Sequence, residues 1–117
     1  MPRTQMIALS SLPETVTRYL AAHSVHDTAA QLVLFAADAT VVDDGSTCEG
    51  IEAIADWMGR SAAEYRYAVR PIAAERADDR HYTVVQHLEG DFPGGAVDLN
   101  FRFALRGGLI ESLVIEP

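Results

Sequence analysis

The hydrophobic positions of this chain change their spacing near residue 65. Before that point, apolar side chains mostly recur every three or four residues, as they do in amphipathic helices. After it, apolar and polar side chains alternate, as they do in strands with one buried face. The pattern predicts helices with one strand among them in the first half of the chain, and a sheet in the second.

Three helices are expected before residue 65. The first begins near Ser11, where Ser11-Leu12-Pro13-Glu14 fits a capping box with proline in the first turn. Asp27 is expected to cap the second helix, and the third follows Gly50. The apolar faces of the three helices are Val16, Tyr19, Leu20 and His23; Ala29, Leu32, Val33, Phe35 and Ala36; and Ile51, Ile54, Ala55, Trp57, Met58 and Ala62.

One short strand is expected between the second and third helices. The β-branched run Thr40-Val41-Val42 favours a strand, and it ends in Asp43. Asp43 therefore leaves a buried strand beside a helix, where its carboxylate can project into the core. The alternative is that Asp43-Asp44-Gly45-Ser46 is an ordinary solvated turn.

Four strands are expected after residue 65, joined by short loops. In the first of them Tyr65, Tyr67 and Val69 alternate with arginines, and Pro71 restricts this strand to a sheet edge or forces a bulge. Consecutive strands with short loops pair antiparallel. The strands after the first are His81–Glu89, Ala96–Leu105 and Leu109–Ile115.

This order of elements predicts an α+β fold in which helices pack on one curved, mostly antiparallel sheet that encloses a pocket. The 117 residues are enough for one domain, with residues 1–10 as an N-terminal extension. Seventeen acidic against nine basic residues give a net charge of −8, which repels phosphate backbones and argues against nucleic-acid binding. The single cysteine, Cys48, fits a reducing compartment, and Met6–Leu9 is too short a run for a signal or a membrane span. We therefore expect a cytoplasmic protein without membrane contact.

Several stretches carry a resemblance to a known family. They are Thr17–Leu20, Phe35–Asp43, Glu49–Ile54 and the hairpin Arg106–Ile110, so the match runs from about Pro13 to Ile115. In them the chain resembles the NTF2-like superfamily, and most closely its SnoaL-like and ketosteroid-isomerase-like branch. The resemblance implies a cone-shaped barrel, commonly dimeric, with a cofactor-free active site inside the cone. Tyr65, Tyr67 and Val69 are candidates for the homodimer face.

The resemblance also implies roles for two residues. In ketosteroid isomerases a tyrosine of the first helix donates a hydrogen bond to the enolate oxygen, and an aspartate after the first strand moves the proton. These positions are Tyr19 and Asp43 here. The family's third group, a protonated aspartic acid, is missing: its position is Leu99 or Asn100, and strand alternation favours Leu99 toward the pocket.

The remaining candidate residues would bind substrate. Alternation places Tyr82, Val84, Gln86 and Leu88 on one strand face, so Tyr82 and Gln86 are candidate polar groups of the pocket. The side chains expected to bind substrate are Phe35, Trp57, Met58, Tyr82, Val84, Gln86, Leu99, Phe101, Phe103 and Leu113.

A metal site is not expected. His81 and His87 lie roughly 20 Å apart along one strand, at about 3.3 Å per residue, and His23 and His26 lack a third ligand. Cys48 has no nearby base in the sequence.

Three functions stay open at this point. The first is cofactor-free proton transfer on a small apolar carbonyl compound, of the isomerase or cyclase type, with Asp43 as base and Tyr19 as oxyanion donor. The second is a dehydratase or epoxide hydrolase with polar groups from the later strands. The third is a dimeric protein that binds a small ligand without reaction.

Overall fold

The computed structural model describes residues 4–64 and 66–117, and it is a mixed α+β structure. In this part of the chain the helices are the 3-10 turn η1 (Leu9–Ser11), α1 (Glu14–Ser24), α2 (Thr28–Leu32) and α3 (Ile51–Glu64). The strands are β1 (Gln5–Ile7), β2 (Phe35–Asp43), β3 (Ser46–Glu49), β4 (Tyr67–Asp78), β5 (His81–Gly90), β6 (Ala96–Arg106) and β7 (Leu109–Glu116).

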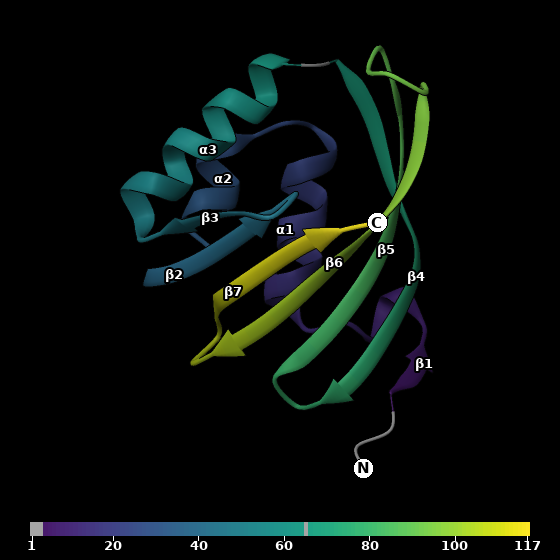
Figure 1. Ribbon diagram of the computed structural model, residues 1–117. Coiled ribbons are helices and arrows are strands. Elements are labelled where there is room, and N and C mark those ends of the chain that lie inside the picture. The colour runs from purple at the N-terminus through teal and green to yellow at the C-terminus, as the bar shows by residue number, and fades with distance from the viewer. Residues whose placement is uncertain (1–3, 65) are drawn as a thin grey trace.

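All seven strands form one sheet in the order β1-β4-β5-β6-β7-β2-β3. Neighbouring strands are antiparallel except for β2 and β7, which run parallel. Figure 1 shows the sheet curving around α1, with α3 over the β2–β3 hairpin. The mostly antiparallel sheet is as predicted, but β1 and β3 are two free ends, so the sheet does not close into a barrel.

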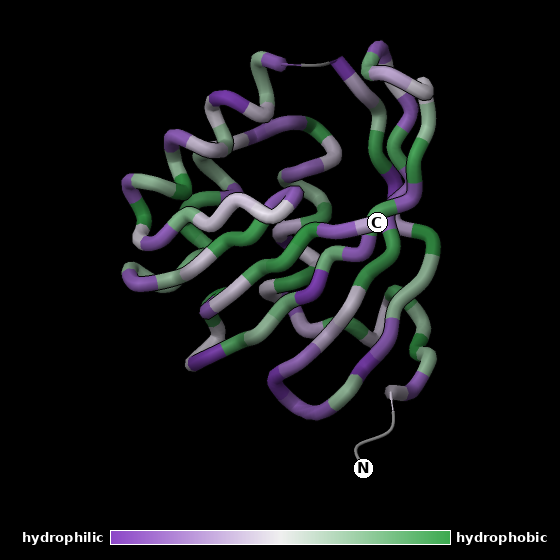
Figure 2. The backbone as a smooth tube through the Cα atoms, in the orientation of Figure 1, coloured by the Kyte–Doolittle hydropathy of each residue, from purple (hydrophilic) through white to green (hydrophobic). Residues whose placement is uncertain are grey.

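The alternation predicted for the long strands is present. Tyr82, Val84, Gln86 and Leu88 of β5 are buried, while the residues between them are more exposed. Phe101, Phe103 and Leu105 of β6 lie on the same inner face. Figure 2 shows the corresponding change between apolar and polar residues along β6. The inner face and the helices together bury the hydrophobic core.

The second helix is shorter than predicted, and the following strand is longer. α2 ends at Leu32, and Phe35 and Ala36 belong to β2. Val33, expected on the apolar face, is 73% exposed. The backbone amide of Ile110 donates to the carbonyl of Leu34 at 2.8 Å, so pairing with β7 takes this segment out of the helix.

The predicted capping box is wrong, whereas the second cap is confirmed. α1 begins at Glu14, and its N-cap is Pro13 without a side-chain bond. Ser11 instead belongs to η1, where its amide donates to the carbonyl of Ala8, so the chain is already turned before the helix. Asp27 does cap α2: its Oδ1 accepts from the amide of Ala30 at 3.0 Å.

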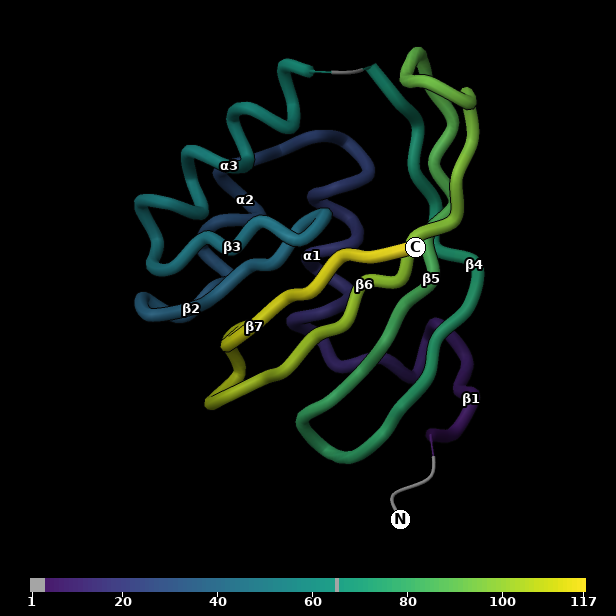
Figure 3. Tube along the Cα trace, in the orientation of Figure 1, coloured from purple at the N-terminus to yellow at the C-terminus, as the bar shows by residue number. Residues whose placement is uncertain are grey.

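The sequence pattern missed two short strands. β1 pairs with residues 74–76 of β4, so part of the expected N-terminal extension is a sheet edge, as Figure 3 shows. β3 pairs back onto β2 through the predicted turn, where Asp44 and Gly45 both have positive φ (51° and 80°). Hence β2 and β3, rather than one strand, lie between α2 and α3.

Pro71 has the surroundings predicted for it. β1 covers β4 only at residues 74–76, so Pro71 has β5 on one side and a free edge on the other. The pairing of β4 with β5 also shifts register between Pro71 and Ala73. The prediction for Tyr65 lies outside the described residues. No helix in the described part of the chain is long and apolar enough to cross a membrane.

Candidate functional site

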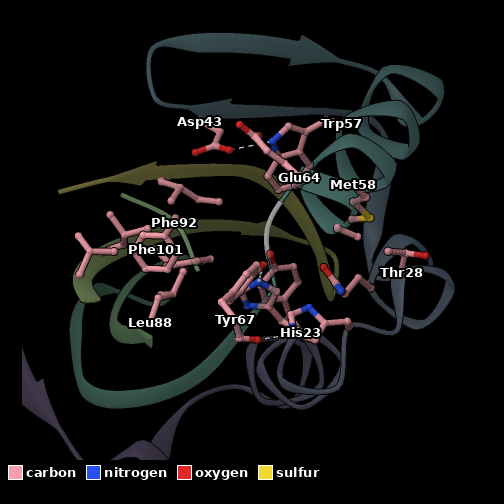
Figure 4. Close-up of a pocket in the computed structure, with 18 residues that line it drawn as sticks. His23, Thr28, Asp43, Trp57, Met58, Glu64, Tyr67, Leu88, Phe92 and Phe101 are labelled. Atoms are coloured by element: carbon pink, nitrogen blue, oxygen red, sulfur yellow. Dashed lines mark hydrogen bonds between the residues drawn. The ribbon is translucent and has the colours of Figure 1, made fainter. Parts of the chain in front are cut away.

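A cavity of about 290 Å³ lies at one end of the sheet, between the helices and the inner face of the strands. Figure 4 shows Asp43 and Trp57 on one side of it and His23 and Tyr67 on the other. Most of the wall is apolar, with a few polar groups facing inward. The lining residues are Tyr19, His23, His26, Thr28, Gln31, Asp43, Trp57, Met58, Ser61, Ala62, Glu64, Tyr67, Leu88, Phe92, Val97, Leu99, Phe101 and Ile115.

Asp43 is the last residue of β2, and its carboxylate is half-buried in the cavity wall. The indole Nε1–H of Trp57, from α3, donates to Asp43 Oδ2 at 2.9 Å, which fixes the carboxyl group. Burial raises the pKa of Asp43 above its ordinary value, and the carboxylates of Asp44 and Glu64 add to the rise. The bond from Trp57 opposes them by favouring the charged form. The net result is a carboxyl group that takes up a proton more readily than an exposed aspartate.

Tyr19 faces the same cavity from α1. Its side chain is 1% exposed and packs edge-on against the rings of Phe35 and Phe103. Burial raises its pKa far above the ordinary range, and Tyr67 and Asp43 raise it further. Tyr19 is therefore a neutral phenol at any ordinary pH, and its hydroxyl has no hydrogen-bond partner among the described residues. Such a group can donate to a ligand oxygen.

A chain of three polar side chains lies next to Tyr19. His23, one helical turn further along α1, contacts the Tyr67 hydroxyl through Nε2 at 3.1 Å. Its Nδ1 contacts the Gln86 amide nitrogen at 3.3 Å. Burial, with a smaller contribution from His26, lowers the pKa of His23 to about 4, so its ring is neutral at pH 7.

The structure brings half of the predicted site residues together. Tyr19 and Asp43, the expected catalytic pair, both line the cavity. Trp57, Met58, Leu99 and Phe101 line it too, and Asn100 does not, so Leu99 has the inward orientation that alternation favoured.

The other predicted substrate-binding residues are part of the core. On β5 and β6 the inward face was predicted correctly, but the cavity occupies only one end of that face. Leu88 and Val97 are paired at the cavity end, whereas Tyr82 and Phe103 are paired toward the end that the hydrophobic core fills. Period-two alternation identifies a face, and it carries no information about which end the helices leave open. The residues outside the cavity lining are Phe35, Tyr82, Val84, Gln86, Phe103 and Leu113.

Sequence reasoning missed Tyr67. It was a candidate for a dimer face together with Val69, yet its ring lines the cavity and Val69 is buried within the single chain. The half-exposed strand pattern did not reveal which face was inward. His23 was identifiable, because it follows Tyr19 by one helical turn on the same apolar face. No three His, Cys, Asp or Glu side chains in the described part of the chain gather as metal ligands.

Comparison with known proteins places this geometry in a family. No protein-family model and no curated protein matches the sequence. Among solved structures, a candidate polyketide cyclase from Sinorhizobium meliloti is 32% identical, with a TM-score of 0.86 over 94% of this chain and 100% of that one. A protein from Catenulispora acidiphila with a ketosteroid isomerase-like fold, solved in complex with trimethylamine, is also 32% identical (TM-score 0.80, covering 92% and 87%).

A more distant structure shares the fold. It is a Mycobacterium tuberculosis protein in complex with estradiol-17β-hemisuccinate, 21% identical, with a TM-score of 0.72 over 86% of this chain and 88% of that one. Two structures that share this fold, the Catenulispora acidiphila protein and the Mycobacterium tuberculosis protein, were thus solved in complex with small molecules. On the identity and coverage of the first two structures, this chain belongs to the NTF2-like superfamily, in its SnoaL-like and ketosteroid-isomerase-like branch.

Proposed function

We propose that this protein is a cofactor-free enzyme that moves a proton on a small apolar carbonyl compound. The observation that carries the proposal is the pairing, in one apolar cavity, of a half-buried carboxyl group and a neutral phenol without a partner in the described chain. A general base works best when its pKa lies near the working pH, and burial moves Asp43 in that direction. The phenol of Tyr19 can stabilise the negative oxygen that forms when the carbon is deprotonated.

The reaction balances with these two groups alone. Asp43 takes a proton from the carbon next to the carbonyl, the electron pair moves onto the carbonyl oxygen, and Tyr19 donates a hydrogen bond to that oxygen. In an isomerase the same proton returns to a different carbon of the conjugated system. Nothing is oxidised or reduced, so no cofactor is needed. The cavity volume, about 290 Å³, fits a compact ligand of one or two rings.

The test uses 3-cyclohexen-1-one, whose conjugated isomer absorbs in the ultraviolet. Wild-type protein is expected to accelerate the isomerisation, and Asp43→Asn is expected to lower kcat by about a hundredfold to ten-thousandfold. Tyr19→Phe should cost on the order of a hundredfold or more, because one oxyanion donor is lost. Thr83→Val, which deletes a half-buried β5 hydroxyl outside the cavity lining, is the matched control. A rate unaffected by Asp43→Asn would contradict the proposed role of Asp43.

A second candidate function is the binding of a small amine without reaction. Asp43 and Glu64 both line the cavity, and none of its lining residues in the described chain is Lys or Arg. Aromatic rings such as Trp57 and Phe101 also face it, which suits an alkylammonium ion. The relative solved with trimethylamine supports this candidate.

A cation and an anion bound in the cavity should respond oppositely to one substitution. Asp43→Asn removes a negative charge while leaving an oxygen that can accept from Trp57. It should therefore weaken the binding of trimethylammonium and strengthen that of an anion such as 4-nitrophenolate. Calorimetric titration of both ligands measures the difference. Tight trimethylammonium binding together with no turnover of the enone would favour the binding protein.

A further inference from the structure

The side chains of His23, Tyr67 and Gln86 form a chain of hydrogen bonds whose direction can be worked out. Gln86 is fully buried, and its Nε2 lies 3.3 Å from His23 Nδ1. Its Oε1 has no partner among the described residues. This orientation leaves Oε1 and one N–H without a partner among the described residues, whereas the reverse would leave both N–H donors without one. A buried N–H without a partner is rarer than such a carbonyl, so the first orientation is favoured. The amide therefore donates, and His23 Nδ1 accepts.

This direction fixes the tautomer of His23. A ring nitrogen that accepts a hydrogen bond carries no proton, so the proton of the neutral ring is on Nε2. Nε2–H then donates to the hydroxyl oxygen of Tyr67 at 3.1 Å. This is the one hydrogen bond that the Tyr67 hydroxyl makes within the described chain. Since the oxygen is the acceptor in it, the phenolic proton is left for another acceptor.

The position of Tyr67 puts the cavity within reach of its hydroxyl group. Its ring lines the cavity, and Figure 4 shows it beside His23 and opposite Asp43. His26 holds the residue from a second side: its Nε2 donates to the main-chain carbonyl of Tyr67 at 2.9 Å, and the two rings meet edge-on at 4.7 Å. His26 has a positive φ of 56°, a conformation that non-glycine residues rarely adopt. The turn between α1 and α2 thus contacts Tyr67 through His26.

We infer that Tyr67 is a second hydrogen-bond donor to a ligand oxygen, beside Tyr19, and that His23 and Gln86 are positioning residues that keep its hydroxyl in the donating orientation. A phenol that accepts a bond from an N–H group is also a stronger donor, because hydrogen bonds in a chain polarise one another. The inference rests on the proposed function and narrows its substrates. The ligand oxygen must accept two hydrogen bonds at once, as a planar enolate or phenolate oxygen does.

The tautomer can be tested without any ligand. Long-range proton–nitrogen correlation spectra of histidine-labelled wild-type protein at pH 7 distinguish Nε2–H from Nδ1–H, and a His23→Gln variant assigns the signal. The expected result for His23 is a neutral ring protonated at Nε2. A ring protonated at Nδ1 would overturn the inference, because Tyr67 would then donate to His23 and not to the cavity. Gln86→Leu removes the amide donor and should produce a mixture of tautomers.

The donor role is tested with 4-nitrophenolate in an Asp43→Asn background, which removes the charge that repels the anion. Adding Tyr67→Phe is expected to lower its affinity between about tenfold and a hundredfold, the usual range for a hydrogen bond to a charged group. The affinity for nitrobenzene, a neutral ligand of similar shape, should change less than threefold. Thr83→Val should change neither affinity. His23→Gln offers an amide N–H in place of Nε2–H, so it should retain more phenolate affinity than His23→Phe.

The outcomes separate the two proposals. Phenolate affinity lost in Tyr19→Phe but unchanged in Tyr67→Phe would overturn the inference and leave the proposed function standing. Affinity unchanged in both variants would overturn both. Equal loss of nitrobenzene and phenolate affinity in Tyr67→Phe would also overturn the inference, because it would show a packing role and not a hydrogen bond.

Discussion

The neutral, buried His23 predicts how the stability of the fold depends on pH. Its ring is 8% exposed, and its pKa falls from an ordinary 6.5 to about 4. In the unfolded chain the ring takes up a proton below about pH 6.5, whereas in the folded protein it does so only near pH 4. Between these values the unfolded state binds more protons, so the free energy of unfolding rises with pH and falls on acidification. Replacing His23 with Gln removes this dependence.

The size of the effect follows from the two pKa values. Binding one more proton in the unfolded state costs the fold about 2 kcal/mol between pH 7 and pH 5, and roughly 3 kcal/mol by pH 4. Carboxylates also titrate in this range, but they are common to wild type and His23→Gln, so their contributions largely cancel in the difference.

Urea denaturation at a series of pH values measures that difference. The free energy of unfolding of wild type, minus that of His23→Gln, should fall by about 2 kcal/mol from pH 7 to pH 5. Gln supplies an amide N–H where His23 has Nε2–H, so the variant retains a donor for the Tyr67 hydroxyl. Parallel curves for the two proteins would contradict this expectation, because His23 would then titrate alike in the folded and unfolded states.

The other predictions concern the groups that support the cavity. Trp57→Phe removes the indole donor to Asp43, so the pKa of Asp43 should rise further; carbon NMR of the labelled carboxyl group measures it, and an unchanged midpoint would contradict the account. Gly90→Ala would place a Cβ 2.6 Å from that of Tyr67 and against the carbonyl of Arg66, and should lower the free energy of unfolding by about 1–3 kcal/mol in urea titrations. Gly59→Ala in α3 is its matched control: the new Cβ meets nothing within 4 Å, and better helix propensity should make the change neutral or stabilising by up to about 1 kcal/mol. A stable Gly90→Ala protein would show that β4 can shift away from β5 at Tyr67.

The sequence was most informative where local pattern and tertiary packing agree. Alternation along β5 and β6 identified the buried face, and Asp44-Gly45 identified a turn, because side-chain period and positive φ are local properties. The pattern failed at Phe35 and Ala36, where pairing with β7 overrides a helical spacing. It also missed β1, whose three residues are held by pairing with β4 and not by propensity.

Only part of the candidate site was predictable from the sequence. Resemblance identified Asp43 and Tyr19, and both line one cavity. The bonds of Asp43 to Trp57, and of His23 to Tyr67 and Gln86, join residues far apart in the sequence. No local spacing encodes such contacts, since they depend on how the helices cross the sheet.

In the proposed reaction, Asp43 removes a proton from carbon in this cavity. The most direct measurement of this step is the exchange of deuterium from heavy water into the carbon next to the carbonyl of cyclohexanone, followed by proton NMR. Wild-type protein is expected to exchange deuterium above background, Asp43→Asn at a rate at least about a hundredfold lower, and Thr83→Val at the wild-type rate. Equal exchange rates for wild type and Asp43→Asn would contradict the proposed proton transfer.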